Sequence, residues 1–322
     1  MPQAKNHKTS LLLLKTARRT NRNRPLTPSP TTPRNPLSSR SIKSACALKT
    51  MARDAVKKQL AFACKARLAC SVGDNCVLAV AYQLALKKAH LDVARSYSES
   101  AVSSTVASIR VLSLDSLNTR DLGQTAMLAH CWDTLGWVAF ADGKLDQAQK
   151  YLTSAWQLSR GSVEADHVAQ VFEAQGDKER AIRFYALAMN AHRPESETRH
   201  RLVALVGADD KADAVIAKNR DEFSALSTIK IPNAAKVEGK ADFFVLLKTG
   251  SGPEAVVDGV RFVSGEEKLK PLADALRTVH YDQSLPDSTP VKILRRGTLS
   301  CNANASDCAF QMAQPDEVRS VN

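Results

Sequence analysis

Four side chains that can take part in nucleophilic or acid–base chemistry fall within a short part of the sequence: His130, Cys131, Asp133 and His167. A thiol beside an imidazole is the pair that a cysteine nucleophile needs, because the imidazole accepts the thiol proton. Cys131 and Trp132 are neighbours in a predicted helix, so their side chains point about 100° apart. Cys131 is therefore expected to pack against a neighbouring helix. We assign no catalytic residue and predict that the chain is not an enzyme.

The seven cysteines indicate no metal site. None forms a Cys-x-x-Cys motif, and Cys64, Cys70 and Cys76 recur at a spacing that does not place them on one helix face. Cys301 and Cys308 instead flank a short polar loop between two predicted strands. We predict that these two form a disulfide across the end of the hairpin, the alternative being two neighbouring free thiols. No metal and no cofactor are expected.

The net charge of +12 is concentrated at one end of the chain. Residues 1–70 hold 16 of the 45 Lys and Arg residues and one of the 33 Asp and Glu residues, which leaves 29 basic and 32 acidic residues, a net charge of −3, in the remainder. Residues 1–50 are predicted to be a disordered basic leader, and residues 51–75 a basic helix or linker. Binding of nucleic acid or membrane through this leader is an alternative function, and nucleic-acid binding is not expected of the folded part.

The sequence gives conflicting signals about location. No stretch is apolar over the roughly 18 residues that a transmembrane helix needs. The longest leucine run, Leu11–Leu14, is too short for the centre of a secretory signal, so no signal peptide is visible. A disulfide between Cys301 and Cys308 would nevertheless favour a periplasmic or otherwise exported protein. A leader that is not the natural amino terminus would reconcile the two signals.

The clearest structural signal is a repeated pattern of large and small residues. The motif Trp132-x-x-Leu135-Gly136 lies in a unit that begins near Ala129, and a similar unit begins near Ser162, 33 residues later. This periodicity predicts an array of helical hairpins over residues 76–208. The best-defined predicted hairpin joins Thr119–Ala141 to Leu145–Ser159.

Small residues in these units are predicted to let paired helices approach closely. Gly136 is such a position in the first helix, while Trp132 and Leu152 fill the remaining space between the helices. The pair before residue 109 has the same character but fewer of the marker residues, as terminal repeats often do.

In these features residues 76–206 resemble tetratricopeptide repeat proteins. The resemblance implies that the first helix of each pair lines a concave groove that binds a protein or peptide, and its carboxylates favour a neutral or basic partner. The alternative for Trp137 and Phe140 is burial under a preceding helix. The groove residues that the resemblance implies are His130, Asp133, Thr134, Trp137, Phe140, Asp166, His167, Gln170 and Glu173.

The last part of the chain has a different composition, with short apolar runs bounded by turn residues. Its order, β-β-α-β-β, predicts a small α+β domain over residues 236–322, joined to the repeats by a linker over 209–235. The fold class predicted for the whole chain is mainly α, a tetratricopeptide-type helical hairpin array followed by this small domain. The expected strands and helix are Phe243–Leu247, Val256–Val263, Glu267–His280, Val291–Leu299 and Cys308–Met312.

A second resemblance concerns both parts of the chain. The run Trp132–Trp137, the segment Arg295–Cys301 and the later Cys308 are similar to the C-terminal part of large acidobacterial proteins that carry a transglutaminase-like domain upstream. That domain is absent here, so the resemblance implies a catalytically empty portion of such an envelope protein. The main hypothesis is a non-enzymatic scaffold that binds a peptide or protein, and this portion of a larger protein is the alternative.

Overall fold

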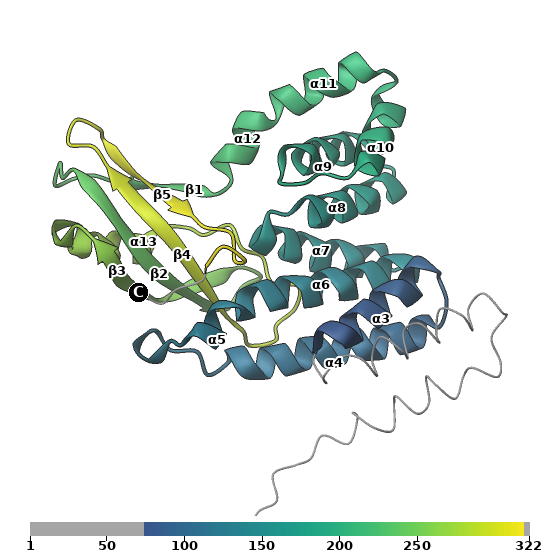
Figure 1. Cartoon of the computed structure of the whole chain (residues 1–322), viewed down its shortest axis with the longest axis horizontal. Helices are drawn as coiled ribbons and strands as arrows, with labels where there is room; N and C mark the ends of the chain where they lie inside the picture. The colour runs from purple at the N-terminus through teal and green to yellow at the C-terminus, as the bar shows by residue number, and fades with distance from the viewer. Residues whose placement is uncertain (1–73, 319–322) are drawn as a thin grey trace, which may run out of the picture. The chain divides into compact units, whose positions relative to one another are not determined.

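A computed structural model describes residues 74–318, which all belong to one structural unit of the chain. Within this range the fold is mainly helical and ends in an antiparallel sheet of five strands (Figure 1). The predicted leader over 1–50 and nearly all of the predicted basic helix over 51–75 lie outside the described residues. Among the helices of residues 74–318, none combines the length and hydrophobicity needed to cross a membrane.

Successive helices pack as hairpins, and each hairpin contacts the next. Helix α6 packs on both α4 and α7, and α8 packs on both α7 and α9. The turns that close two of the hairpins contain Gly143 and Gly176, at φ angles of 74° and 80°, where a residue with a side chain would be strained. The helices are α3 (Asp74–Leu86), α4 (Leu91–Ile109), α5 (Thr119–Leu122), α6 (Gln124–Ala141), α7 (Leu145–Ser159), α8 (Ser162–Ala174), α9 (Lys178–Asn190), α10 (Ser196–Val206), α11 (Asp209–Lys218) and α12 (Arg220–Ala225).

The predicted close approach within a hairpin is present between α6 and α7. A Cβ atom added at Gly136 would lie 2.7 Å from Cγ of Leu152 and 3.1 Å from its backbone nitrogen. Leu152 is fully buried. The absence of a side chain at Gly136 therefore sets how closely the two helices can pack.

The sheet has the strand order β1-β5-β4-β2-β3, and every neighbouring pair is antiparallel. Strand β2 carries the run Phe243–Leu247, which is buried along its whole length. A short 3₁₀ helix, η3, and α13 follow β3 in place of the single helix predicted over Glu267–His280. The elements are β1 (Thr228–Pro232), β2 (Gly239–Thr249), β3 (Ala255–Gly265), η3 (Glu267–Leu272), α13 (Ala273–Thr278), β4 (Lys292–Cys301) and β5 (Asp307–Met312).

The segment 209–235, predicted to be a linker, is ordered: it contains α11, α12 and strand β1. Strand β1 pairs with β5 and places Ile231 in the core. Pairing covers an edge of β5 that would otherwise expose its backbone hydrogen-bonding groups. The sequence does not predict β1 within this segment, because only Ile229 and Ile231 have the apolar side chains that mark a strand.

The sheet and the helices share one hydrophobic core. Ile109, Trp132 and Leu158 from the helices belong to the same buried cluster as Phe244 and Leu294 from the sheet. Thr125 of α6 also extends the sheet's hydrogen bonding, because its hydroxyl donates to the backbone oxygen of Leu294 at 2.9 Å and accepts from its N–H at 3.1 Å. The helical array and the sheet therefore pack against each other through α4, α6 and α7.

Cys301 and Cys308 form a disulfide between the end of β4 and the start of β5. We expect an alkylating reagent to leave both thiols unlabelled in the denatured protein unless a reductant is added. Replacing both with serine is expected to lower the free energy of unfolding by about 2 kcal/mol, because the bond closes a short loop in the unfolded chain. Mass spectrometry tests the first point and urea unfolding the second. Full labelling of both thiols without reductant would contradict the disulfide.

Candidate binding site

The nine predicted groove residues lie on α6 and α8, but several of them are part of the core. Trp137 is 8% exposed and packs beneath α3 with Leu84 and Ala85. For Trp137 the structure therefore corresponds to the alternative, burial under a preceding helix, and Phe140 is half-buried beside it. Asp133, Thr134 and His167 are also buried, Asp166 and Gln170 are half-buried, and His130 and Glu173 are exposed.

A buried polar cluster joins α3, α6 and α8. Nδ1 of His167 lies 2.8 Å from Oδ1 of Asp133, and Nε2 of the same ring lies 3.4 Å from the hydroxyl of Tyr82. The imidazole stacks on Trp137 with ring centroids 4.1 Å apart. Each ring nitrogen thus has a partner, and the cluster fixes the relative positions of three helices.

The thiol of Cys131 does not belong to this cluster. It lies 3.4 Å from the hydroxyl of Thr105 on α4 and packs with Leu78 and Ala101. This is the helix contact that the sequence predicted for Cys131. His167 faces Asp133 and Tyr82 instead.

Three groups around this cluster have shifted pKa values. Burial lowers the pKa of His167, but the charge and hydrogen bond of Asp133, with smaller contributions from Asp166 and Glu164, more than compensate, so this pKa lies above its ordinary value. Burial, and then the charge of Asp133, raise the pKa of Glu164. The same two causes, in the same order, raise the pKa of Tyr82 to about 12. Asp133 is thus the negative charge to which the neighbouring groups respond.

The other predicted groove residues hold neighbouring helices together. Asp166 accepts hydrogen bonds from Gln170 at 2.6 Å and from Thr198 of α10 at 2.8 Å. Glu173 accepts one from the hydroxyl of Tyr185 on α9 at 2.6 Å. These carboxylates have structural partners, which leaves them less available to a ligand.

A pocket of about 590 Å³ opens beside the polar cluster. One wall comes from α6, with His130 and Asp133, and the next from the α7–α8 turn and the start of α8, with Glu164. The far walls are Phe223 of α12 and the segment 314–317 that follows β5. Segments from four distant parts of the sequence therefore meet around one cavity.

The position of Glu164 depends on Gly161. Its carboxylate occupies the space that a side chain at Gly161 would need, and the whole residue is only 7% exposed. The sequence patterns do not indicate Glu164, Arg160 or the segment 314–317 as site residues. A glycine followed three residues later by a glutamate at a predicted helix start was the available signal for Glu164.

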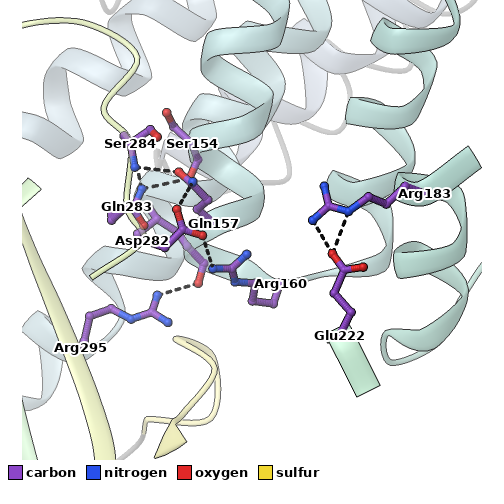
Figure 2. A network of polar contacts seen from close by, with 10 residues as sticks. Ser154, Gln157, Arg160, Arg183, Glu222, Asp282, Gln283, Ser284 and Arg295 are labelled. Atoms are coloured by element: carbon purple, nitrogen blue, oxygen red, sulfur yellow. Dashed lines mark hydrogen bonds and ion pairs between the residues drawn. The ribbon is translucent and has the colours of Figure 1, made fainter. Parts of the chain in front are cut away.

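A polar network fixes the α7–α8 turn against the sheet (Figure 2). The guanidinium of Arg160 pairs with Asp282 at 3.4 Å and lies over the ring of Trp156. Arg295 of β4 donates to the backbone oxygen of Leu158 at 2.7 Å. Burial, together with the nearby charge of Arg160, lowers the pKa of Arg295 to about 10. The turn that carries Gly161, directly before the start of α8 where Glu164 lies, is therefore anchored to the sheet.

Figure 2 also shows the contact that positions the pocket wall on α12. Nε of Arg183 on α9 donates to Oε1 of Glu222 at 2.7 Å. Glu222 precedes Phe223, the residue of α12 that lines the pocket. The wall is thus tied to the helical array through α9.

The fold and the pocket define a helical array joined to an antiparallel sheet, with an acidic cavity beside a buried Asp133–His167 pair. In residues 74–318 no group of three or more His, Cys, Asp or Glu side chains is arranged to hold a metal ion. No protein-family model, curated protein or solved structure matches this chain.

Proposed function

We propose that the chain is a non-enzymatic binding module of the tetratricopeptide type that captures a peptide segment of a partner protein. The binding site is the pocket between α6, the α7–α8 turn, α12 and the segment 314–317. The observation that carries the proposal is the pocket itself, since its volume of about 590 Å³ is in the range of cavities that hold a ligand.

Several features of the helical array support the repeat-type assignment. Gly143 and Gly176 occupy equivalent turns, each after the first helix of a hairpin, and Gly136 provides the close approach of α6 to α7. In this assignment α6 and α8 are first helices, the ones that line the ligand side. The pocket is on these helices, at the end of α8 where the chain enters from α7.

Two alternatives rest on separate observations. The disulfide between Cys301 and Cys308 favours an exported protein, as expected for a catalytically empty portion of a larger transglutaminase-like envelope protein. The 16 Lys and Arg residues among residues 1–70 favour binding of nucleic acid or membrane by the leader. The acidic lining of the pocket supports neither of these alternatives directly, and we prefer peptide capture.

Selection of random peptides displayed on phage, with the full chain as bait, tests the proposal. We expect enriched sequences that bind the wild type and bind Ala126→Leu at least about tenfold more weakly, because the larger side chain fills the pocket wall. Ala174→Leu, an equal change at an exposed position at the far end of α8, is the control. Peptides that bind both variants equally well would show that the binding site lies outside this pocket.

A further inference from the structure

We infer that the pocket recognises a cationic side chain, lysine or arginine, of the bound peptide, which it holds between Glu164 and Asp133. This inference rests on the proposed function and names the chemistry of the partner at that site. It is carried by an unpartnered buried carboxylate, by the charge of the pocket lining and by the shape of the cavity.

The first observation is that Glu164 has no partner that explains its burial. The residue is 7% exposed, yet in residues 74–318 no other residue forms an ion pair or a hydrogen bond with its carboxylate. Its own backbone N–H and the charges of His130 and His167 offset the burial only in part, so its pKa is raised. Burying a carboxylate without a counter-charge is costly, and proteins normally pair such groups. The carboxylate lines the pocket, so a cation arriving there would supply the missing partner.

Asp133 adds a second carboxylate to the same site. Its Oδ1 atom is engaged by His167, and the residue lines the pocket from α6. Two carboxylates that share a buried site repel each other, which is one reason that the pKa of Glu164 is raised. A bound ammonium or guanidinium group would relieve this repulsion and donate hydrogen bonds to the carboxylates of both walls.

The rest of the lining has the same sign. The segment after β5 contributes Asp316 and Glu317, so four carboxylates line the cavity. Among the lining residues that the structure describes, the one guanidinium is that of Arg160, which pairs with Asp282 and lies over Trp156, while its Nε and Nη1 atoms have no hydrogen-bond partner. His130 and His192 also line it. An anionic ligand would be repelled by this lining, whereas a cationic one is complementary.

The cavity is also too large for an ion alone. Its volume of about 590 Å³ can take a long side chain with part of its backbone. Ala126, Ala129, Phe223 and Pro315 supply an apolar wall, against which the methylene stem of lysine or arginine can pack while its charged end reaches the carboxylates. A peptide side chain therefore matches both the charge and the shape of the pocket.

The test compares blocked pentapeptides of the form acetyl-Ala-Ala-X-Ala-Ala-amide, with X as lysine, arginine, norleucine or glutamate. Ligand-observed NMR with the full chain gives the dissociation constants. The same measurement with n-butylammonium tests whether a free amine binds without a peptide. We expect the lysine and arginine peptides to bind at least about tenfold more tightly than the norleucine peptide, which has the same stem without the charge.

The matched variants are Glu164→Gln and Glu197→Gln. The first keeps the shape of the pocket and removes the charge, so the preference for lysine over norleucine should fall to about twofold or less. The second makes the same change at an exposed position on α10 and should leave the preference intact. If Glu164→Gln lowers the unfolding midpoint, Ala126→Leu provides the second test, because it should weaken lysine-peptide binding with all carboxylates present.

Each contrary outcome has a distinct meaning. Equal binding of the lysine and norleucine peptides, or tighter binding of the glutamate peptide, would overturn the cation inference and leave peptide capture in place. Binding of n-butylammonium as tightly as the lysine peptide would show that a free amine is sufficient. That result would overturn the inference that the cation belongs to a peptide, and the proposed function with it. A lysine preference that survives in Glu164→Gln would overturn the assignment to this site.

Discussion

Replacing Gly136 with valine is expected to lower the free energy of unfolding by about 3 kcal/mol. The added Cβ atom alone would lie 2.7 Å from Cγ of Leu152, and the two further methyl groups would need space that the α6–α7 contact does not have. Leu152 is fully buried, and its nearest atoms include the backbone nitrogen, so a side-chain rotation cannot relieve the clash. Urea unfolding followed by circular dichroism measures the loss.

Gly123→Val is the control for this prediction. Gly123 has a helical φ of −80°, and its nearest neighbour to an added Cβ atom is the backbone oxygen of Arg120 at 3.9 Å. We expect a change within about 0.5 kcal/mol, the size of a helix-propensity difference. A similar loss in both variants would show that valine acts through helix propensity and that the close approach at Gly136 does not limit stability.

The helical hairpins were the most predictable part of the fold, because their signals are local. Leu145–Ser159 was predicted with the bounds that α7 has in the structure, since Gly143 marks the preceding turn and the small residues recur at helical spacing. The helix predicted over Thr119–Ala141 is divided at Gly123 into α5 and α6. Asn118 and Asp121 form a capping box at the start of α5, and this is a signal that the sequence contained.

The sheet was predicted less completely because its pairing is not local. Four strands were expected from their apolar runs, but β1 has only two apolar positions that mark it. Its partner β5 lies about 80 residues further along the chain, where Ile231 is aligned with Cys308. The sharing of one core between the sheet and α6 was not predictable either, because no sequence pattern indicates which faces of two elements meet.

The candidate site illustrates the same limit. The resemblance placed Asp133 and His167 on facing first helices, and they are in contact. It did not indicate that α3 covers Trp137, since the first hairpin has few marker residues. Glu164 was missed because its burial depends on the turn at Gly161 and on the segment 314–317, which is distant in sequence.

Replacing His167 with leucine is expected to lower the free energy of unfolding by about 3 kcal/mol at pH 6. The variant keeps an apolar side chain beneath Trp137 but leaves the carboxylate of Asp133 buried beside Glu164 without its partner. His200→Leu, at an exposed position on α10, is the control and should change stability little. Equal stability of wild type and His167→Leu would contradict a stabilising role for the Asp133–His167 pair.

The pH dependence of stability separates the charge of His167 from its packing. The pKa of His167 is raised above 6.5 in the folded protein, so the folded state binds the proton more tightly than the unfolded state. The pair therefore contributes its full stabilisation below about pH 6.5, and this contribution is lost as pH rises through the higher pKa of the folded state. The pKa of Glu164 is also raised, from 4.5, so this residue adds a further loss of stability with rising pH that begins near pH 4.5. Urea unfolding from pH 5 to 9 should thus show that the free energy of unfolding decreases above pH 6.5. This decrease should persist in Glu164→Gln and disappear in His167→Leu. A decrease that remained in His167→Leu would have to arise from another group.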